Sequence, residues 1–326
     1  MSESSLVIGG DLGGTSTRIL VADRTGRTVG RGLAGGGNPT AHPDSAADAL
    51  AGALRAALTG LDPAAVGAAV IGAAGGGALR QPAVWERFDA VWSAAGLRCE
   101  PAYVADLLVA FVSGTPSPDG TVLIAGTGSG AGDVRDHRLT RTADSYGWLL
   151  GDDGSGFWLG REAVRTTLQA LDAGDPLGPL GEAVMRALLT DPDAPGSVLS
   201  GVDGARDALI RAANSQPPVR LSHLARHVSD AYDAGDPVAV TIAERAAKLL
   251  SATVGRVRPA GTSGPLVLAG TVAGETSPVG RILREILRGE TVLTARDGLG
   301  GATWLALRTL DPTLATPEAH TRLVTS

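Results

Sequence analysis

Gly10-Asp11-Leu12-Gly13-Gly14-Thr15 follows the apolar run 6–8, and Gly126-Thr127-Gly128-Ser129-Gly130 follows the apolar run 122–125. In both stretches small residues and a hydroxyl stand where a strand is expected to end, so backbone N–H groups can approach an anion closely. A second strand-like stretch comes after each, which predicts a hairpin and not a helix start. The pattern predicts two similar units, each able to hold a phosphate group.

Two common glycine-rich alternatives do not fit. A dinucleotide fingerprint and a P-loop both need glycines that open a helix, and a P-loop also needs Lys followed by Ser or Thr. The single lysine, Lys248, is far from both stretches. The stretch 126–130 alone would also suit an ordinary tight hairpin. The acidic Asp11 in the first stretch favours phosphate and metal binding.

The bulk properties exclude several functional classes. A chain of 326 residues predicts two domains, and we place them at 1–117 and 118–326, joined by the Gly- and Pro-rich segment 114–120. The net charge is −6, and the sequence contains no stripe of basic residues that could bind nucleic acid. No apolar run reaches the ~20 residues that a membrane helix needs. Without a visible secretory signal, we expect a soluble, cytoplasmic protein.

Cysteine and histidine give little support for a metal centre. The single Cys99 forms no internal disulfide and by itself ligates no cluster, and we expect it to be half-buried. His223 and His227 have helical i, i+4 spacing without the Glu of a zinc motif, so we expect one exposed helix face.

Helices and strands alternate in the order βββαβαβα, and the opening pattern recurs from Thr121. The second copy is larger, and a final helix near 300–310 is expected to pack back on the first domain. The expected strands are 6–11, 18–23, 28–34, 66–73, 102–105, 121–125, 131–135, 138–143 and 265–269. The expected helices are 43–58, 82–95, 107–112, 156–171, 177–189, 202–213, 221–234, 237–257 and 300–310.

Five motifs occur in order between Leu6 and Leu310, namely 10–15, Val104-Ala105-Asp106, 126–130, Tyr146-Gly147-Trp148-Leu149-Leu150-Gly151-Asp152-Asp153-Gly154-Ser155 and Leu268-Ala269-Gly270-Thr271. With them the chain resembles the N-acetylglucosamine kinases of the actin-like sugar-kinase ATPase superfamily, in the branch that also holds activator ATPases of acyl-CoA dehydratases and reductases. The resemblance implies an α/β fold of two actin-like (ribonuclease H-like) domains, each with a central mixed sheet. It places the active site in the cleft between them.

The resemblance also implies transfer of the γ-phosphoryl group of ATP to the 6-hydroxyl of N-acetylglucosamine, with Mg²⁺ as cofactor. Asp106 then corresponds to the general base, and Asp11 holds the metal. As bare sequence features, Asp106 would equally suit a helix N-cap, and Asp11 could stabilise its own turn.

Nucleotide contacts are implied at Gly13, Gly14 and Thr15, at Gly126, Thr127, Gly128 and Ser129, and at Gly270 and Thr271. A plain strand-to-loop turn explains the last pair almost as well. The glycines of 298–302 would likewise serve only to let the last helix pack tightly.

The sugar contacts implied by the resemblance are Asn38, Asp106, Tyr146, Gly147, Asp152 and Asp153. The two acids would equally place negative charge at the first turn of the helix that follows. Trp148 stands where several relatives carry His, and Asp153 where many carry Glu. The contact to the anomeric side of the sugar and the hydroxyl reached by Asp153 are therefore open.

Other functions of the same fold are glucosamine or glucose kinase, an ATPase switch that activates a reductase or dehydratase, and a nucleotide-binding regulator. The switch needs a bridging iron–sulfur cluster, and two subunits with one cysteine each supply two thiolates where four are usual. No basic helix-turn-helix segment precedes Leu6, which disfavours the regulator. We expect the sugar and ATP as partners and, on symmetry grounds, a homodimer.

Overall fold

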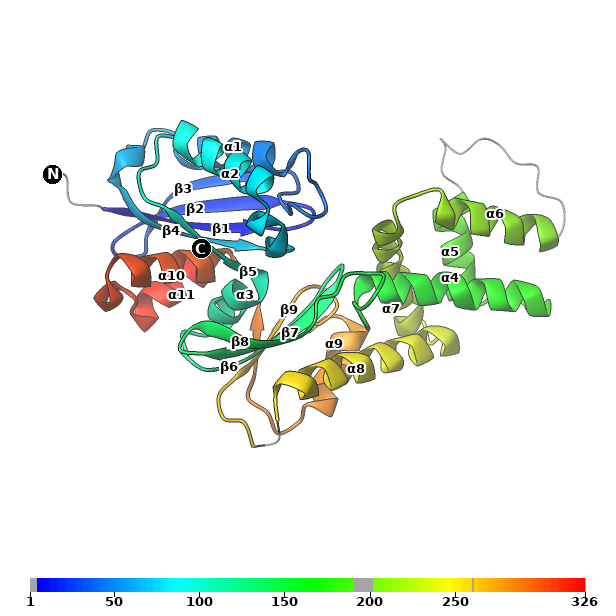
Figure 1. Ribbon diagram of the computed structural model, residues 1–326. Coiled ribbons are helices and arrows are strands. Elements are labelled where there is room, and N and C mark those ends of the chain that lie inside the picture. The colour runs from blue at the N-terminus through cyan, green and yellow to red at the C-terminus, as the bar shows by residue number, and fades with distance from the viewer. Residues whose placement is uncertain (1–4, 190–201, 260, 326) are drawn as a thin grey trace.

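The computed structural model describes residues 5–189, 202–259 and 261–325 and contains two five-stranded sheets (Figure 1). The first has the order β3-β2-β1-β4-β5. Its strands are β1 (Leu6–Leu12), β2 (Thr17–Asp23), β3 (Thr28–Ala34), β4 (Val66–Ala73) and β5 (Pro101–Ala105). β1 pairs antiparallel with β2 and parallel with β4, so the sheet is mixed.

The second sheet repeats this arrangement with the order β10-β9-β6-β7-β8. Its strands are β6 (Gly120–Ala125), β7 (Ser129–Arg135), β8 (Arg138–Asp144), β9 (Leu266–Ala269) and β10 (Val292–Ala295). β6 and β7 form an antiparallel hairpin, and β6 pairs parallel with β9. The predicted α/β fold with two mixed sheets is confirmed, and both glycine stretches connect hairpin strands.

Helices cover both faces of the first sheet (Figure 1). One face carries α1 (Ala46–Ala57) and α2 (Pro82–Ala94), and the other carries α10 (Leu299–Leu310) with α11 (Pro317–Thr325) behind it. A Cβ added to Gly9 would lie 2.4 Å from the backbone nitrogen of Thr303. Glycine at this position in β1 therefore lets α10 lie directly on the sheet.

The helix α3 (Asp106–Gly114) joins the two sheets because it packs on β4 and β5 of one and on β6, β7, β9 and β10 of the other. One buried apolar cluster includes Val7 of β1, Val109 of α3 and Val267 of β9. The two halves thus share a core around α3 and α10. The domain boundary after residue 117 stays a prediction.

The second half adds a helical part that extends away from its sheet, while α8 packs on β6, β7 and β8 and α9 packs on α8 (Figure 1). Its helices are α4 (Gly156–Ala173), α5 (Pro179–Leu189), α6 (Val202–Asn214), α7 (Ala225–Asp233), α8 (Pro237–Val257) and α9 (Pro278–Ile286). No helix among the described residues is both long and apolar enough to cross a membrane.

The predicted helix 221–234 is wrong at its start. A 3-10 segment, Pro218–Leu224, precedes α7, so His223 and His227 lie on different elements and do not share one helix face. The helix near residue 300 is not the last one, because α11 follows it. α9, β10 and α11 were not predicted, and each is at most nine residues long.

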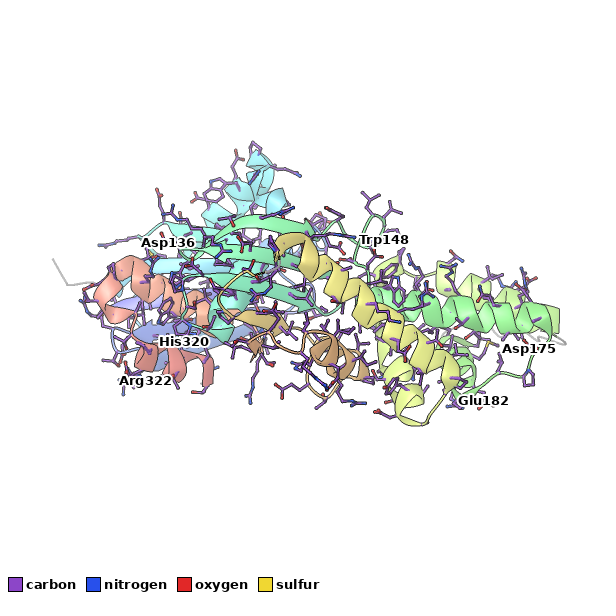
Figure 2. The ribbon with its side chains drawn as sticks, turned by 90° about the horizontal axis from the view of Figure 1, so that it is seen from below. Asp136, Trp148, Asp175, Glu182, His320 and Arg322 are labelled. Carbon is purple, nitrogen blue, oxygen red and sulfur yellow. The ribbon has the colours of Figure 1, made fainter. Side chains whose placement is uncertain are left out.

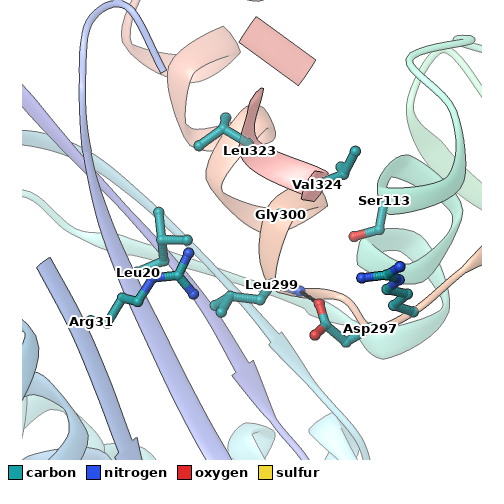
Figure 3. Close-up of a pocket in the computed structure, with 9 residues that line it drawn as sticks. Leu20, Arg31, Ser113, Asp297, Leu299, Gly300, Leu323 and Val324 are labelled. Carbon is teal, nitrogen blue, oxygen red and sulfur yellow. Dashed lines mark hydrogen bonds between the residues drawn. The ribbon is translucent and has the colours of Figure 1, made fainter. Parts of the chain in front are cut away.

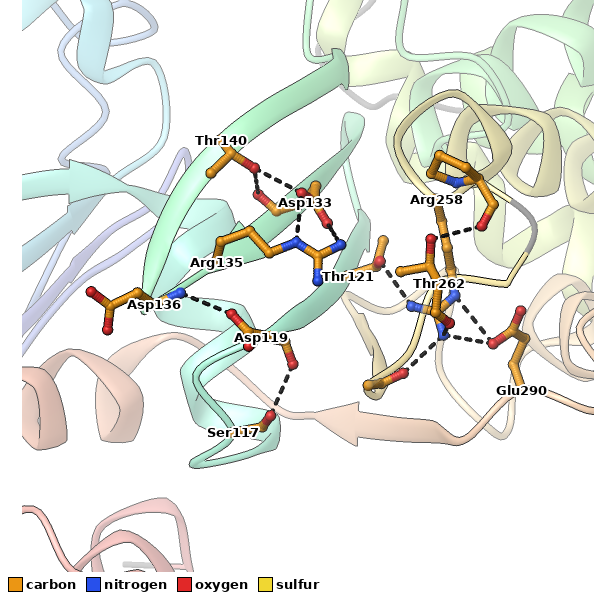
Figure 4. A network of polar contacts seen from close by, with 12 residues as sticks. Ser117, Asp119, Thr121, Asp133, Arg135, Asp136, Thr140, Arg258, Thr262 and Glu290 are labelled. Carbon is orange, nitrogen blue, oxygen red and sulfur yellow. Dashed lines mark hydrogen bonds and ion pairs between the residues drawn. The ribbon is translucent and has the colours of Figure 1, made fainter.

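A buried arginine fixes the end of α8 to the second sheet (Figure 4). The guanidinium of Arg258, whose side chain is 4% exposed, lies 2.6 Å from the carboxylate of Glu290 and donates to the Thr121 hydroxyl at 3.0 Å. It also donates to the Gly264 carbonyl at 2.8 Å. These charge-assisted bonds tie the strand β6 to the loops beside β9 and β10.

Candidate active site

The first glycine turn projects from the end of β1. The Gly13 N–H donates to the Ser16 carbonyl at 2.9 Å and closes the turn. Gly14 and Thr15 at its tip are exposed. The turn can therefore offer the N–H groups of Gly14 and Thr15 and the Thr15 hydroxyl to a ligand without first breaking the hairpin.

Asp11 is held between two charged residues that the sequence analysis missed. Its carboxylate lies 3.2 Å from Arg18, which lies 2.7 Å from Asp297 just before α10. Burial raises the pKa of Asp11, the Arg18 guanidinium opposes this, and the Asp297 charge adds to the rise. Arg18 faces Asp11 across the hairpin, so the register could have suggested this pair. Asp297 carries no local signal, because only tertiary packing brings it there.

Asp106 is the first residue of α3, directly after β5. Its carboxylate accepts the N–H of Leu107 at 2.9 Å. Burial, with a smaller contribution from the nearby Asp11 charge, raises the pKa of Asp106 to about 6, although the Leu107 N–H acts in the opposite direction. A carboxyl group with such a pKa can be ionised at neutral pH and still hold a proton well.

The second glycine turn is held from outside by an acidic loop. The Ser129 N–H donates to the Asp152 carboxylate at 2.9 Å, and the Ser129 hydroxyl donates to the Asp153 carbonyl at 3.1 Å. A Cβ on Gly128 would lie 2.7 Å from the Asp152 carboxylate. The absence of a side chain at 128 therefore leaves room for the Asp152 carboxylate on this turn.

The start of α4 also lies on the second turn. Gly156 donates its N–H to the Gly126 carbonyl at 2.7 Å, and Phe157 donates to the Thr127 carbonyl at 3.0 Å. Ser155 caps the helix, since its hydroxyl accepts the Trp158 N–H at 3.3 Å. The carbonyl groups of the turn are thus satisfied by the protein.

Asp144, which the sequence analysis did not single out, organises the acidic loop. Its buried carboxylate accepts the N–H groups of Asp152 at 2.9 Å and Asp153 at 3.2 Å. Burial raises the pKa of Asp152, the Ser129 N–H opposes this, and the charges of Asp144 and Asp153 raise it further. Asp144, Ser145 and Asp152 all have positive φ, so these hydrogen bonds hold a sharply bent backbone.

Gly270 and Thr271 lie beside the second turn. Gly270 has a φ of +89°, and a Cβ there would lie 2.4 Å from the Ala125 carbonyl oxygen. The same oxygen accepts the Val272 N–H at 2.9 Å. Thr271 is exposed next to these contacts. The structure therefore brings the segment expected to contact adenosine to the start of the second glycine turn.

Asn38 lies beside the first turn. The N–H groups of Gly37 and Asn38 both donate to the Gly13 carbonyl, at 3.0 and 3.1 Å. The Asn38 side-chain oxygen accepts the N–H groups of Thr40 and Ala41, which orients its amide nitrogen. His42, also missed from sequence, has its Nε2 2.6 Å from the Gly14 carbonyl and must donate there.

The loop before the acidic pair is exposed. Tyr146 and Trp148 are 63% and 40% exposed, and Gly147 between them has a φ of +79°. The ring of Trp148 lies 5.8 Å from that of Phe157 in α4, where the second sheet meets the helical part (Figure 2). The aromatic side chains at this loop are therefore open to a ligand or to the opposite half.

The predicted site residues fall into two groups. Asp11, Asp106, Asn38 and the turn 13–15 belong to the first half, and the turn 126–129, Asp152, Asp153 and Gly270 surround one another in the second. No hydrogen bond joins the two groups within the described ranges.

The donor set near Asp11 fits Mg²⁺ and does not fit a metal that needs a protein cage. No cluster of three or more His, Cys, Asp or Glu residues in the described part of the chain could hold an ion. Mg²⁺ is commonly bound by one or two carboxylates together with water and phosphate oxygens. One carboxylate, Asp11, beside the first glycine turn would meet that requirement.

Comparison with known proteins gives a consistent result. The pattern of the BadF/BadG/BcrA/BcrD ATPase family matches residues 8–303, and no curated protein sequence matches the chain. A provisionally named N-acetylglucosamine kinase from Chromobacterium violaceum has a TM-score of 0.72 at 24% identity, over 93% of this chain and 99% of that one. A second kinase named in the same way, from Porphyromonas gingivalis, has a TM-score of 0.65 at 21% identity, over 94% of this chain and 99% of that one.

A third solved structure is a ROK family glucokinase from Streptomyces griseus in complex with glucose and AMPPNP. It has a TM-score of 0.56 at 25% identity, over 92% of this chain and 99% of that one. The first two likenesses lie below 25% identity and show the shared fold.

Proposed function

We propose, from the premise that this chain belongs to the BadF/BadG/BcrA/BcrD ATPase family, that it is a sugar kinase that phosphorylates the 6-hydroxyl of N-acetylglucosamine. The observation that carries the proposal is Asp106. It stands at the end of β5 beside Asp11, with a pKa raised to about 6 by burial. An ATPase that only switches conformation needs no such base next to its phosphate-binding turn.

In the proposed reaction the sugar hydroxyl gives its proton to the Asp106 carboxylate as its oxygen bonds to the γ-phosphorus. The bond to the β,γ-bridging oxygen breaks, and ADP leaves. The transition state is largely stabilised by positioning and charge, and the base contributes about 10²–10⁴-fold.

The nucleotide would lie between the two glycine turns. Gly13, Gly14 and Thr15 would contact its phosphates from one half, and Gly126, Thr127, Gly128 and Ser129 from the other, with Gly270 and Thr271 against adenosine. Asp11 would hold Mg²⁺ directly or through water. When bound, the ion neutralises charge on the phosphates.

The sugar would be held by Asn38, Asp106, Asp152 and Asp153, with Tyr146 and Gly147 at its edge. The free amide nitrogen of Asn38 and the raised pKa of Asp152 support such contacts. The Streptomyces griseus structure contains glucose and AMPPNP in the same fold, which supports a sugar acceptor and ATP. The names of the two closer-fitting structures make N-acetylglucosamine the first acceptor to test, before glucosamine and glucose.

A coupled ADP-release assay tests the proposal, with Mg²⁺-ATP and either N-acetylglucosamine, glucosamine, glucose, N-acetylmannosamine or no sugar. We expect release that depends on N-acetylglucosamine, and proton-coupled ³¹P NMR of the product locates the phosphoryl group on O6. Release that depends on glucose or glucosamine instead would revise the acceptor. ADP release at the same rate with and without each sugar would contradict the proposed kinase activity and favour the ATPase switch.

A further inference from the structure

A pocket of about 160 Å³ lies outside both glycine turns (Figure 3). It lies among β2, β3, the start of α10 and the end of α11. A Cβ on Gly300 would lie 2.8 Å from the Leu323 carbonyl oxygen and 2.9 Å from the Val324 Cα. The glycine run that opens α10 therefore lets α11 close over this pocket, a role the sequence left open.

The pocket carries an excess of positive charge. Arg31 from β3 and Arg296 before α10 both line it. Both residues are exposed, and neither makes an ion pair or hydrogen bond with another residue in the described part of the chain. Asp297 also lines it, but its charge is matched by Arg18 at 2.7 Å. The remaining walls include buried Leu20 and Leu299. Two exposed guanidinium groups without a protein partner give the pocket a positive charge, which favours a small anion over a cation.

The size of the pocket suits a phosphate group. An engineered cavity of about 150 Å³ holds a benzene molecule, so about 160 Å³ accommodates the five heavy atoms of phosphate with room to spare. A guanidinium group presents parallel N–H donors that match two phosphate oxygens. We propose that this pocket binds a phosphate group, either inorganic phosphate or the phosphate end of a monoester, through Arg31 and Arg296.

The site is separate from the glycine turns yet connected to one of them. None of the residues of 13–15 or 126–130 lines the pocket. Asp297, however, forms part of its wall and holds Arg18, which lies 3.2 Å from Asp11. A bound phosphate group would thus act on the carboxylate at the end of β1 from outside the sugar and nucleotide contacts.

Calorimetric titration of the full-length protein tests the proposal, with Mg²⁺ and AMPPNP at saturation so that the nucleotide site is filled. Inorganic phosphate and glucose 6-phosphate are titrated separately, which distinguishes the free ion from a monoester. We expect one remaining phosphate site in the wild type. Arg31→Gln and Arg296→Gln should each weaken it about tenfold or more, since each removes a charge-assisted contact.

Arg55→Gln is the matched control, because Arg55 is exposed on α1, on the opposite face of the first sheet, and should leave the affinity unchanged. In the wild type, ¹³C methyl signals of Leu20 and Leu299 should shift on phosphate addition, which gives a result that does not depend on any variant. Absence of phosphate binding to the nucleotide-saturated wild type, or equal affinity in the double arginine variant, would overturn the proposal.

Discussion

The two glycine turns occupy equivalent places in sheets of the same strand order, yet they are held by different partners. In the first, side-chain charges meet at the end of the strand, where Arg18 bridges Asp11 and Asp297. In the second, the turn itself is clamped, with Asp152 on the Ser129 N–H and the start of α4 on its carbonyls. A repeated hairpin thus acquired two different surroundings.

This difference suggests a division of roles. Carboxyl groups with a raised pKa occur in both halves, at Asp11 and Asp106 in the first and at Asp152 in the second. The second half uses its acids to shape the turn and the loop 144–155. We therefore expect substitution of Asp106 to lower kcat and substitutions at the second turn to raise the KM for ATP.

Asp106→Asn should have the largest effect. Loss of the general base is expected to lower kcat by about 10²–10⁴-fold, while ATP and sugar binding persist. Turnover is measured by ADP release and nucleotide binding by calorimetry. Asp48→Asn, an exposed change on α1, is the control. Near-wild-type turnover in Asp106→Asn would show that Asp106 is not the general base.

The pH profile sharpens the same comparison. Because Asp106 must be ionised to accept a proton, wild-type kcat/KM should fall about tenfold per pH unit as pH drops below about 6. The residual activity of Asp106→Asn should lack this break. An unchanged break in the variant would assign the titration to another group.

Asp106→Asn should also raise stability at neutral pH. The pKa of the folded-state carboxyl lies above 3.8, so its favourable contribution is present below that pH and is lost as pH rises through about 6. We expect the free energy of unfolding to rise by up to about 3 kcal/mol at pH 8, with little difference at pH 3.5. Urea unfolding at both pH values measures it, and equal stability at pH 8 would contradict burial as the cause of the shift.

Gly270→Ala tests the second turn. The added methyl meets the Ala125 carbonyl at 2.4 Å in a positive-φ backbone, so we expect about 1–3 kcal/mol of strain and a higher KM for ATP, with kcat less affected. Gly235→Ala is a close control, since Gly235 has a φ of +82° but no atom within 4 Å of an added Cβ. Identical KM values in the two variants would argue against a nucleotide role for this segment.

His42→Ala should have the smallest effect. Loss of the hydrogen bond to the Gly14 carbonyl should weaken ATP binding by about 1 kcal/mol, or about fivefold, and His42→Gln should restore part of it because its amide can donate. Calorimetric titration with ATP measures the affinity of both variants. No change in His42→Ala would mean that the first turn keeps its shape without this contact.

Much of the fold was readable because hydrophobic periodicity and turn chemistry are local. The strand Val66–Ala73 and the helix Pro237–Val257 were predicted with their observed bounds. The splitting of 221–234 and the existence of α11 were not, because short elements gain most of their stability from packing. α11, for example, places His320 2.6 Å from the Val112 carbonyl, 208 residues away.

The sequence by itself determined the two hairpin turns, the family resemblance and the candidate acids, because glycines and carboxylates at strand ends are visible as a linear pattern. Only the tertiary structure decided that Arg18 and Asp297 surround Asp11, that Asp144 shapes the loop of Asp152, and that a pocket opens beside α10. The physical reason is that charge pairing and burial depend on distances in space, and residues 11 and 297 come together only after α10 packs on the first sheet.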